Sequence, residues 1–220
     1  MPPDKSFRLE ERFILCEGQD DKNFLEALAR RSQLSFQVKS SSELSKDSTT
    51  GGRPGFIPAL AGFHVQSGFD DLRGVLIVTD NDNDKAFKDT QRVLTANGYT
   101  PPNTSTELGY INGKPVRILL IPPNQHGDLE ALCLPAVLEK WPYAKDCAKT
   151  FLACTGASSW SKETKKRKAF LRSIIVGCNE ADPYNGLGIL FQREILNINH
   201  PCLNEVYEVL SRFDNVMQGN

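Results

Sequence analysis

The chain has 220 residues and a formal net charge of −1, with 40% hydrophobic and 24% charged residues. This is the composition of a globular protein with a packed core, and it argues against a disordered chain. The near-neutral charge gives no general attraction to nucleic acid or acidic membranes, so any nucleic-acid contact must come from a local basic patch. No apolar run approaches the ~18 residues of a membrane span, and residues 1–12 lack a signal-peptide pattern. We therefore expect a cytoplasmic protein.

The first part of the chain alternates apolar strands with helical or loop segments. Residues 13–16 form a continuous apolar run, which predicts a buried strand, and an amphipathic helix follows it. A second strand is expected at residues 34–38. Residues 40–54 are rich in Ser, Thr, Gly and charge, which predicts a flexible surface loop. Residues 56–72 are weakly helical, and residues 74–79 form the strongest predicted strand of the chain.

A further helix is predicted after that strand, and a hairpin follows. Residues 108–111 and 116–121 flank an Asn-Gly dipeptide at 112–113, which favours a two-residue turn between two strands. From residue 134 onward the pattern is helical, although the apolar run at 187–191 leaves one more strand open.

Strand–helix alternation followed by helices predicts an α/β fold, in which a mainly parallel sheet is flanked by helices. We expect this core over residues 1–135. A helical C-terminal extension over residues 136–220 should pack on it as one compact unit. Ligands of such sheets bind at the carboxyl ends of the strands, which is where both acidic clusters of this chain are expected.

Five carboxylates in these clusters are candidate metal ligands. Glu17 and Asp21 follow the first predicted strand, and Asp80, Asp82 and Asp84 follow the strongest one. If the two strands are neighbours, the carboxylates converge and raise one another's pKa unless a cation lies among them. Oxygen ligands select hard ions such as Mg²⁺, Mn²⁺ or Ca²⁺. In extended backbone every second side chain points to the same side, so Asp80 and Asp82 are expected to point the same way. This expectation is weakest for Asp84, because the turn has begun before it.

The run from Asp80 to Asp84 has two other interpretations. Asp and Asn are favoured in solvated turns and at helix N-termini, and this interpretation stays open for the run taken alone. Glu17, directly after a buried strand, favours a functional site instead. We reject an EF-hand, because Lys85 stands where Gly is needed and Gln91 where a bidentate Glu is needed.

Two motifs resemble the TOPRIM domain, which is shared by topoisomerases, bacterial primases, the maturation ribonuclease of 5S RNA and OLD-family nucleases. They are Glu-Gly-Gln-Asp-Asp at 17–21 and Asp-Asn-Asp at 80–82, each closing a predicted strand. Residues 122–132 and the Lys-Ala pair at 168–169 resemble a small stand-alone TOPRIM family close to the OLD type, so the likeness covers most of the chain. Gln19 departs from the pattern, since Lys is common there. No Gly follows the second motif, which weighs against the 5S ribonuclease.

The resemblance implies a TOPRIM-like, Rossmann-like sheet and a divalent-metal-dependent nuclease that hydrolyses phosphodiester bonds of DNA or RNA. The ligands of Mg²⁺ or Mn²⁺ that it implies by motif match are Glu17, Asp80 and Asp82, with Asp21 as an outer ligand. OLD-type enzymes add an acidic residue and a lysine to a two-metal site, and Glu130 and Lys168 are the candidates here. The general base is then Glu17 or Glu130.

A basic segment lies in the predicted helical extension. Its candidate nucleic-acid-binding residues are Lys162, Lys165, Lys166, Arg167 and Arg172. Phosphate contacts by these side chains would make binding steeply dependent on salt. A solvated helix face explains most of them at least as well.

Two other functions stay open. One is a TOPRIM-fold subunit that holds metal or nucleic acid but cuts nothing alone. It would be part of a phage-defence system with a partner protein such as an ATPase, since OLD-type TOPRIM domains are often coupled to ATPases. The other is a receiver-like phospho-acceptor domain, against which Glu17 argues. A homo-oligomer is also left open, and no membrane partner is expected.

Overall fold

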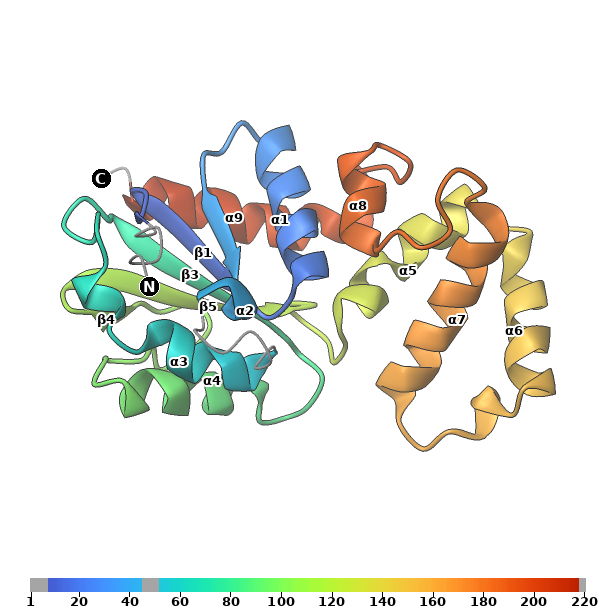
Figure 1. Ribbon diagram of the computed structural model, residues 1–220, viewed down its shortest axis with the longest axis horizontal. Helices are drawn as coiled ribbons and strands as arrows, with labels where there is room; N and C mark the ends of the chain where they lie inside the picture. The colour runs from blue at the N-terminus through green and yellow to red at the C-terminus, as the bar shows by residue number, and fades with distance from the viewer. Residues whose placement is uncertain (1–7, 45–51, 218–220) are drawn as a thin grey trace, which may run out of the picture.

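Residues 8–44 and 52–217 are described by a computed structural model, in which a five-stranded sheet lies between two layers of helices (Figure 1). The strands are β1 (Arg12–Cys16), β2 (Gln37–Ser40), β3 (Gly74–Asp80), β4 (Gly109–Ile111) and β5 (Lys114–Ile121). Their order across the sheet is β2-β1-β3-β5-β4. Strand β4 pairs antiparallel with β5, whereas the pairings among β2, β1, β3 and β5 are parallel. The sheet is therefore mainly parallel, as the sequence predicts.

Helices α1 and α9 cover one face of the sheet, and α3 and α4 cover the other (Figure 1). The α-helices are α1 (Gln19–Arg31), α2 (Ser41–Leu44), α3 (Phe56–Leu60), α4 (Ala86–Ala96), α5 (Leu129–Lys140), α6 (Ala144–Cys154), α7 (Glu163–Cys178), α8 (Leu187–Gln192) and α9 (Asn204–Met217). Short 3-10 helices lie at Arg53–Gly55, Phe63–Val65, Ala157–Ser159 and Pro201–Leu203.

The central strands are apolar on both faces because each face is covered by helices. In β1, Ile14 and Cys16 belong to the core under α1 and α9, while Phe13 and Leu15 belong to the core under α3. All four side chains are fully buried. This two-sided burial explains why residues 13–16 and 74–79 are continuous apolar runs rather than alternating ones.

The register of the parallel strands aligns their carboxyl ends. Cys16 of β1 pairs with Val78 of β3, and Asp80 of β3 pairs with Ile121 of β5. Glu17 therefore leaves the sheet beside Thr79, next to the point where β3 ends.

Helices α5, α6 and α7 extend beyond the carboxyl edge of the sheet, and α8 and α9 return to the sheet (Figure 1). The contact between α8 and α1 depends on Asp20, whose carboxylate accepts the backbone N–H groups of Leu187 at 3.0 Å and Gly188 at 2.8 Å. Gly186 is required there, because a Cβ atom at this position would collide with that carboxylate.

Several predicted elements are confirmed. The hairpin turn has Asn112 at φ +46° and Gly113 at φ +84°, the left-handed conformations of a two-residue hairpin turn. The helix after the strongest strand is α4, in which Val93 and Leu94 are buried. The expected boundary between residues 135 and 136 falls inside α5.

Three expectations differ from the structure. The run at 187–191 is helix α8, because Asp20 satisfies the N–H groups of its first turn. The second strand is displaced to 37–40, where it pairs with β1. The predicted loop at 40–54 contains α2 and the 3-10 turn that begins at Arg53, and its residues 45–51 lie outside the described part of the chain.

No helix in the described residues is long and apolar enough to cross a membrane.

Candidate functional site

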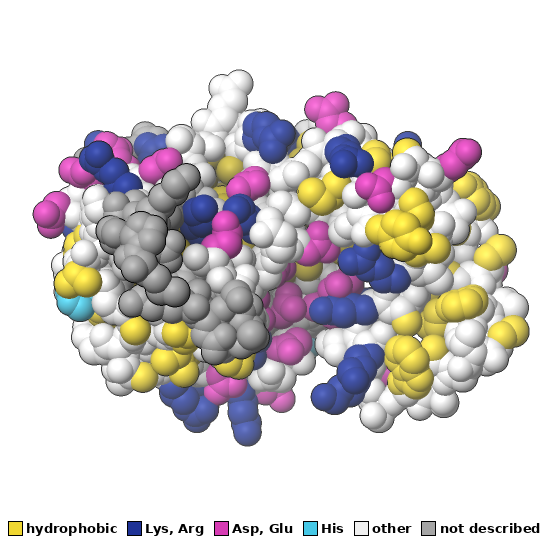
Figure 2. All heavy atoms as spheres, viewed as in Figure 1, with side chains coloured by type: hydrophobic (Ala, Val, Ile, Leu, Met, Phe, Trp, Pro, Cys, Tyr) yellow, Lys and Arg dark blue, Asp and Glu magenta, His cyan; other side chains and the backbone are white. Residues whose placement is uncertain are grey.

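Acidic side chains gather in the furrow between the sheet and the α5–α7 helices, and basic side chains line the opposite wall (Figure 2). We use the name acidic centre for Glu17, Asp21, Asp80 and Asp82. Two of these residues follow β1 and two stand at or just beyond the end of β3. Because β1 and β3 are parallel neighbours, the fold brings both predicted motifs to one place, as their positions after strands lead us to expect.

Glu17 bridges the ends of the two strands. Its Oε1 atom accepts hydrogen bonds from the Thr79 hydroxyl and from the Asp80 backbone N–H, the latter at 3.1 Å. Its backbone carbonyl accepts the Ser41 hydroxyl at 2.9 Å. These contacts hold the Glu17 carboxylate over the carboxyl end of β3.

Asp21 lies in the first turn of α1 and is fixed by a capping interaction. Its Oδ2 accepts the backbone N–H of Gly18 at 2.9 Å. Burial, together with the neighbouring Glu17 charge, raises the pKa of Asp21 to about 7. Asp20 has a different role: its carboxylate caps α8 and is not a member of the acidic centre.

Asp80 ends β3 and faces the start of α5. Its Oδ1 accepts the backbone N–H of Leu129 at 3.2 Å. Burial, together with the charges of Asp21 and Glu17, raises the pKa of Asp80 to about 8, although Lys168 opposes the shift. In the absence of a cation, two carboxyl groups of the acidic centre are therefore substantially protonated near neutral pH.

Glu130 and Lys168 meet beside this centre. Lys168 Nζ on α7 lies 3.7 Å from Glu130 Oε1 on α5. Burial raises the pKa of Glu130, and the Lys168 charge partly offsets that effect. Burial alone would lower the pKa of Lys168, but the carboxylates of Glu130 and Asp80 raise it above its ordinary value. The pair that the sequence could only suggest by resemblance is thus close to the acidic centre.

Arg53 is a member of the site that the sequence does not predict. Its Nη2 atom lies 2.7 Å from the Asp80 carbonyl oxygen, 2.9 Å from Asp82 Oδ1 and 3.4 Å from Glu17 Oε1. Its Nε atom donates to the Thr79 hydroxyl at 2.9 Å. The guanidinium therefore lies between carboxylates from the two strand ends. Arg53 falls in the segment 40–54, whose composition predicts only a flexible surface loop.

The loop from β5 to α5 is held against the end of β3 by Asn81. The Asn81 side-chain amide donates to the carbonyls of Pro122 at 3.1 Å and Gln125 at 2.9 Å, and its backbone carbonyl accepts the N–H of Gly127 at 2.8 Å. These bonds fix where α5 begins. They thereby place Glu130 in its first turn, next to Asp80.

Asp128 and Arg167 join α5 to α7. Asp128 caps α5 by accepting the N–H of Ala131 at 2.9 Å, and its Oδ1 also pairs with Arg167 Nη1 at 2.6 Å. The Asp128 side chain is 1% exposed, so this ion pair is largely removed from water. Arg167 is therefore structural in this arrangement, and the ion pair orients the turn of α7 that carries Lys168.

The other predicted site residues differ in how far their side chains are exposed to solvent. The Asp82 side chain is 39% exposed. Asp84 is 91% exposed and pairs with His126 at 2.9 Å, so it lies on the rim and not in the acidic centre. Of the basic segment, Lys166 pairs with Glu163 at 2.7 Å, and Arg172 donates to the Asn185 carbonyl at 2.8 Å.

Lys162 and Lys165 are exposed. Lys165 and Lys168 are three residues apart on α7, so they share a face of that helix. In the basic segment, Lys166, Arg167 and Arg172 thus have partners within the protein, whereas Lys162 and Lys165 are exposed.

A metal ion fits the chemistry of the acidic centre, although its side chains are not arranged around one. Within residues 8–44 and 52–217, no three Asp, Glu, His or Cys side chains are grouped so as to hold a metal ion. At the acidic centre the Arg53 guanidinium occupies the space between Glu17 and Asp82. The donors are oxygen atoms only, which suits Mg²⁺ or Mn²⁺. Burial and the neighbouring carboxylates raise the pKa values of Asp21 and Asp80, and a cation among them would favour their ionised forms.

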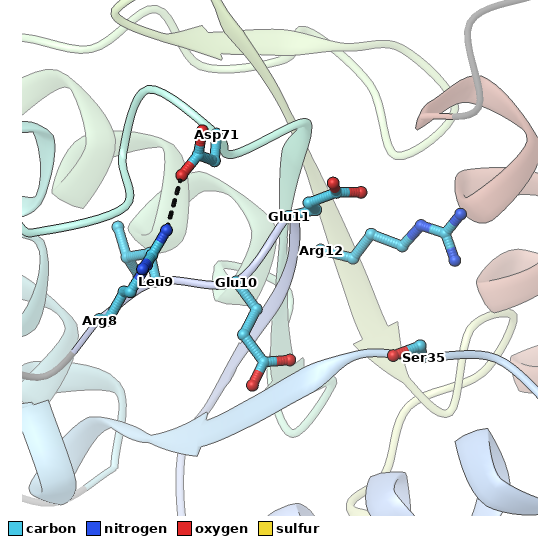
Figure 3. A pocket seen from close by; sticks show the side chains of 7 residues that line it. All are labelled: Arg8, Leu9, Glu10, Glu11, Arg12, Ser35 and Asp71. Atoms are coloured by element: carbon cyan, nitrogen blue, oxygen red, sulfur yellow. Dashed lines mark hydrogen bonds and ion pairs between the residues drawn. The ribbon is translucent and has the colours of Figure 1, made fainter.

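Hollows also lie away from this site. One, of about 540 Å³, is lined by residues 8–12 with Ser35 and Asp71, beside the start of β1 (Figure 3). The interaction drawn among these residues is an ion pair between Arg8 and Asp71, 3.1 Å apart, and both side chains are exposed. Another, of about 610 Å³, lies between α6 and α7 and is lined largely by apolar side chains.

The chain was also compared with known proteins. Residues 11–215 match the family described as "Protein of unknown function (DUF3226)", a match that takes in both acidic motifs, Glu130 and Lys168. No curated protein and no solved structure matches the chain. The chain belongs to the DUF3226 family.

Proposed function

We propose that the chain is a TOPRIM-type, divalent-metal-dependent phosphodiesterase that acts on DNA or RNA. The observation that carries the proposal is the meeting of three parts of the chain. Glu17 directly follows β1 and accepts the Asp80 N–H, Asp80 ends β3 with Asp82 just beyond it, and the Glu130–Lys168 pair joins α5 to α7 beside Asp80. Carboxylates from adjacent strand ends, with a lysine opposite, form a suitable site for phosphoryl chemistry.

Each side chain has a role in this proposal. Glu17, Asp80 and Asp82 would hold Mg²⁺ or Mn²⁺, which supplies Lewis-acid activation of phosphate and water when bound. Glu130 takes a proton from the attacking water, for which its raised pKa suits it. Lys168 neutralises the negative charge that develops on the phosphate oxygens.

A partner-dependent, non-cleaving subunit is the second candidate. The observation in its favour is the apolar hollow on α6 and α7, beside which Tyr143, Phe151 and Val176 are each at least half exposed. Exposed apolar patches commonly mark protein–protein contacts. On this alternative, the acidic centre holds metal or nucleic acid but cuts only when a partner protein such as an ATPase is bound.

Cleavage assays test the proposal. Plasmid, single-stranded DNA and structured RNA are incubated with the protein in Mg²⁺, Mn²⁺ or EDTA, alongside Glu17→Gln and Asp80→Asn. Asp146→Asn is the matched control, because Asp146 is 91% exposed on α6 and pairs only with Lys149 among the described residues. We expect metal-dependent cutting that both site variants lose and the control keeps.

Two outcomes oppose the proposal. Cutting that survives in EDTA or in both site variants would show that metal bound at the acidic centre does not catalyse the cleavage. No cutting, together with Mn²⁺ binding that both site variants lose, would favour the partner-dependent subunit.

A further inference from the structure

The Arg53 guanidinium contacts two carboxylates that the proposed function assigns to metal binding. Its Nη2 atom is 2.9 Å from Asp82 Oδ1 and 3.4 Å from Glu17 Oε1. The Arg53 side chain is 14% exposed and that of Glu17 is 17% exposed, so the pair is only partly screened by water. In the absence of metal, the positive charge of Arg53 thus balances the negative charges of Glu17 and Asp82.

The backbone of Arg53 is fixed independently of its side chain. Gly52 donates its N–H to the Glu17 carbonyl at 3.2 Å, and the Ser41 hydroxyl donates to the Gly52 carbonyl at 3.2 Å. Gly52 has φ +70°, a conformation that favours glycine. The turn is closed by the Gly55 N–H on the Gly52 carbonyl at 3.0 Å. The side chain can therefore exchange partners, or be shortened, without loss of the turn.

Arg53 and a divalent cation compete for the same oxygen atoms. A cation that binds Glu17 and Asp82 would lie within a few ångströms of the guanidinium, and like charges at that separation repel strongly in a partly buried site. It would also take the Asp82 oxygen that now accepts from Nη2 and the Glu17 oxygen that lies 3.4 Å from Nη2. Occupancy by the cation and the present position of the guanidinium therefore exclude each other.

We propose that Arg53 is an exchangeable counter-ion of the acidic centre. It pairs with Glu17 and Asp82 until a divalent cation replaces it, and it then binds a phosphate oxygen of the nucleic acid at the same edge of the sheet. This inference rests on the proposed function. It adds Arg53 to the residues of the proposed function and gives an order of binding. The metal binds first and releases the Arg53 guanidinium, which then binds phosphate.

The guanidinium is chemically suited to its second partner. Arginine binds phosphate through two parallel N–H donors, a geometry that lysine cannot reproduce. Among the described residues, the contacts of the guanidinium are made by Nη2 and Nε. The neighbouring Asp82 side chain is 39% exposed, which places the exchange at the accessible side of the centre.

The test separates metal binding from nucleic-acid binding. Mn²⁺ affinity is measured by titration calorimetry for the wild type, Arg53→Gln and Arg53→Lys. The affinity of each protein for short fluorescein-labelled DNA and RNA strands is measured by anisotropy in saturating Ca²⁺. Arg92→Gln is the control for the loss of one positive charge, since Arg92 is 73% exposed on α4 and pairs with Asp89. Circular dichroism checks that every variant is folded.

The two measurements should change in opposite directions. Arg53→Gln should bind Mn²⁺ roughly ten-fold more tightly, because no guanidinium must be displaced, and should bind nucleic acid roughly ten-fold more weakly. Arg53→Lys should bind Mn²⁺ nearly as the wild type does and should not restore nucleic-acid affinity. The strand type that loses affinity, DNA or RNA, identifies the preferred ligand.

Several results would overturn the inference. Equal Mn²⁺ affinity in the wild type and Arg53→Gln would reject the counter-ion role while leaving the proposed function intact. Weaker binding of both ligands by Arg53→Gln would make Arg53 a structural residue. No Mn²⁺ binding by any of the proteins would reject the proposed function as well, so the two failures are distinguishable.

Discussion

The ammonium group of Lys168 lies 3.7 Å from the carboxylate of Glu130, and this contact joins α7 to the first turn of α5. The Glu130 side chain is 17% exposed and that of Lys168 is 52% exposed, so the lysine approaches a buried acid from the solvent side. The two groups also influence each other's protonation. Loss of one should therefore alter the behaviour of the other.

Lys168→Met tests this coupling. Without the ammonium group, burial acts unopposed and the pKa of Glu130 rises further. If Glu130 accepts a proton during cleavage, the acid limb of the pH–rate profile should move to higher pH. The rate at neutral pH should fall by about 100-fold or more, because Lys168 also stabilises developing charge. Lys149→Met, at an exposed lysine of α6 that pairs with Asp146, is the control. An unchanged pH profile in Lys168→Met would contradict the assignment.

The stability of the metal-free protein should depend on pH in a direction set by Asp21 and Asp80. Their folded pKa values, about 7 and about 8, lie above the ordinary aspartate value of 3.8. Between about pH 4 and pH 8 the folded state therefore binds more protons than the unfolded state. The free energy of unfolding should accordingly fall as pH rises through this range. The free energy of unfolding is measured by urea denaturation in EDTA at a series of pH values.

Asp80→Asn should remove most of the pH dependence that comes from Asp80. The amide keeps an oxygen for the Leu129 N–H but carries no charge. In EDTA the variant should be more stable than the wild type at pH 8, by an amount on the order of a few kcal/mol, and about equal to it at about pH 4. With Mg²⁺ present the order at pH 8 should reverse. A difference that is the same at both pH values in EDTA would show that Asp80 does not titrate in this range.

Metal binding should release protons. At pH 7 the carboxyl groups of Asp21 and Asp80 are partly protonated, and a cation among the four carboxylates favours their ionised forms. Titration calorimetry with Mn²⁺ in buffers of different ionisation enthalpy should give roughly one proton released per ion at pH 7, and fewer at pH 9. Proton uptake, or no exchange at either pH, would conflict with these assignments.

The contact between α8 and α1 should depend on the absence of a side chain at Gly186. Gly186→Ala would force its Cβ into the Asp20 carboxylate and weaken the two hydrogen bonds that cap α8. We expect a loss of about 1–3 kcal/mol in the free energy of unfolding. Gly177→Ala on α7 is a matched control, because its added Cβ would meet no atom within 4 Å. The control should be neutral or stabilising by about 0.5–1 kcal/mol. Equal effects of the two substitutions would refute the contact.

Much of the sheet and all four members of the acidic centre could be predicted from local sequence. Glu17 and Asp80 were predictable because each directly follows a buried apolar run, and parallel neighbours place such ends together. The Asn112–Gly113 turn was predictable because its backbone conformation restricts which residues can form it.

The remainder depends on contacts between distant segments. Arg53 reaches the acidic centre through hydrogen bonds of its turn to Glu17 and Ser41, which the composition of residues 40–54 does not reveal. Helix α8 was ambiguous because the group that caps it, Asp20, is 167 residues away from Leu187. The proximity of Glu130 and Lys168 likewise depends on how α5 packs against α7, which no spacing in the sequence encodes.

The position of α9 has a consequence for how the protein forms during synthesis. Val206, Leu210 and Phe213 of α9 share a buried core with Ile14 of β1, the first strand of the sheet. Until residues 204–217 have left the ribosome, that face of the sheet lacks one of its two covering helices, and its apolar side chains are open to water. The furrow that contains Glu17 would then reach its final geometry only after α9 has been synthesised and has packed on the sheet.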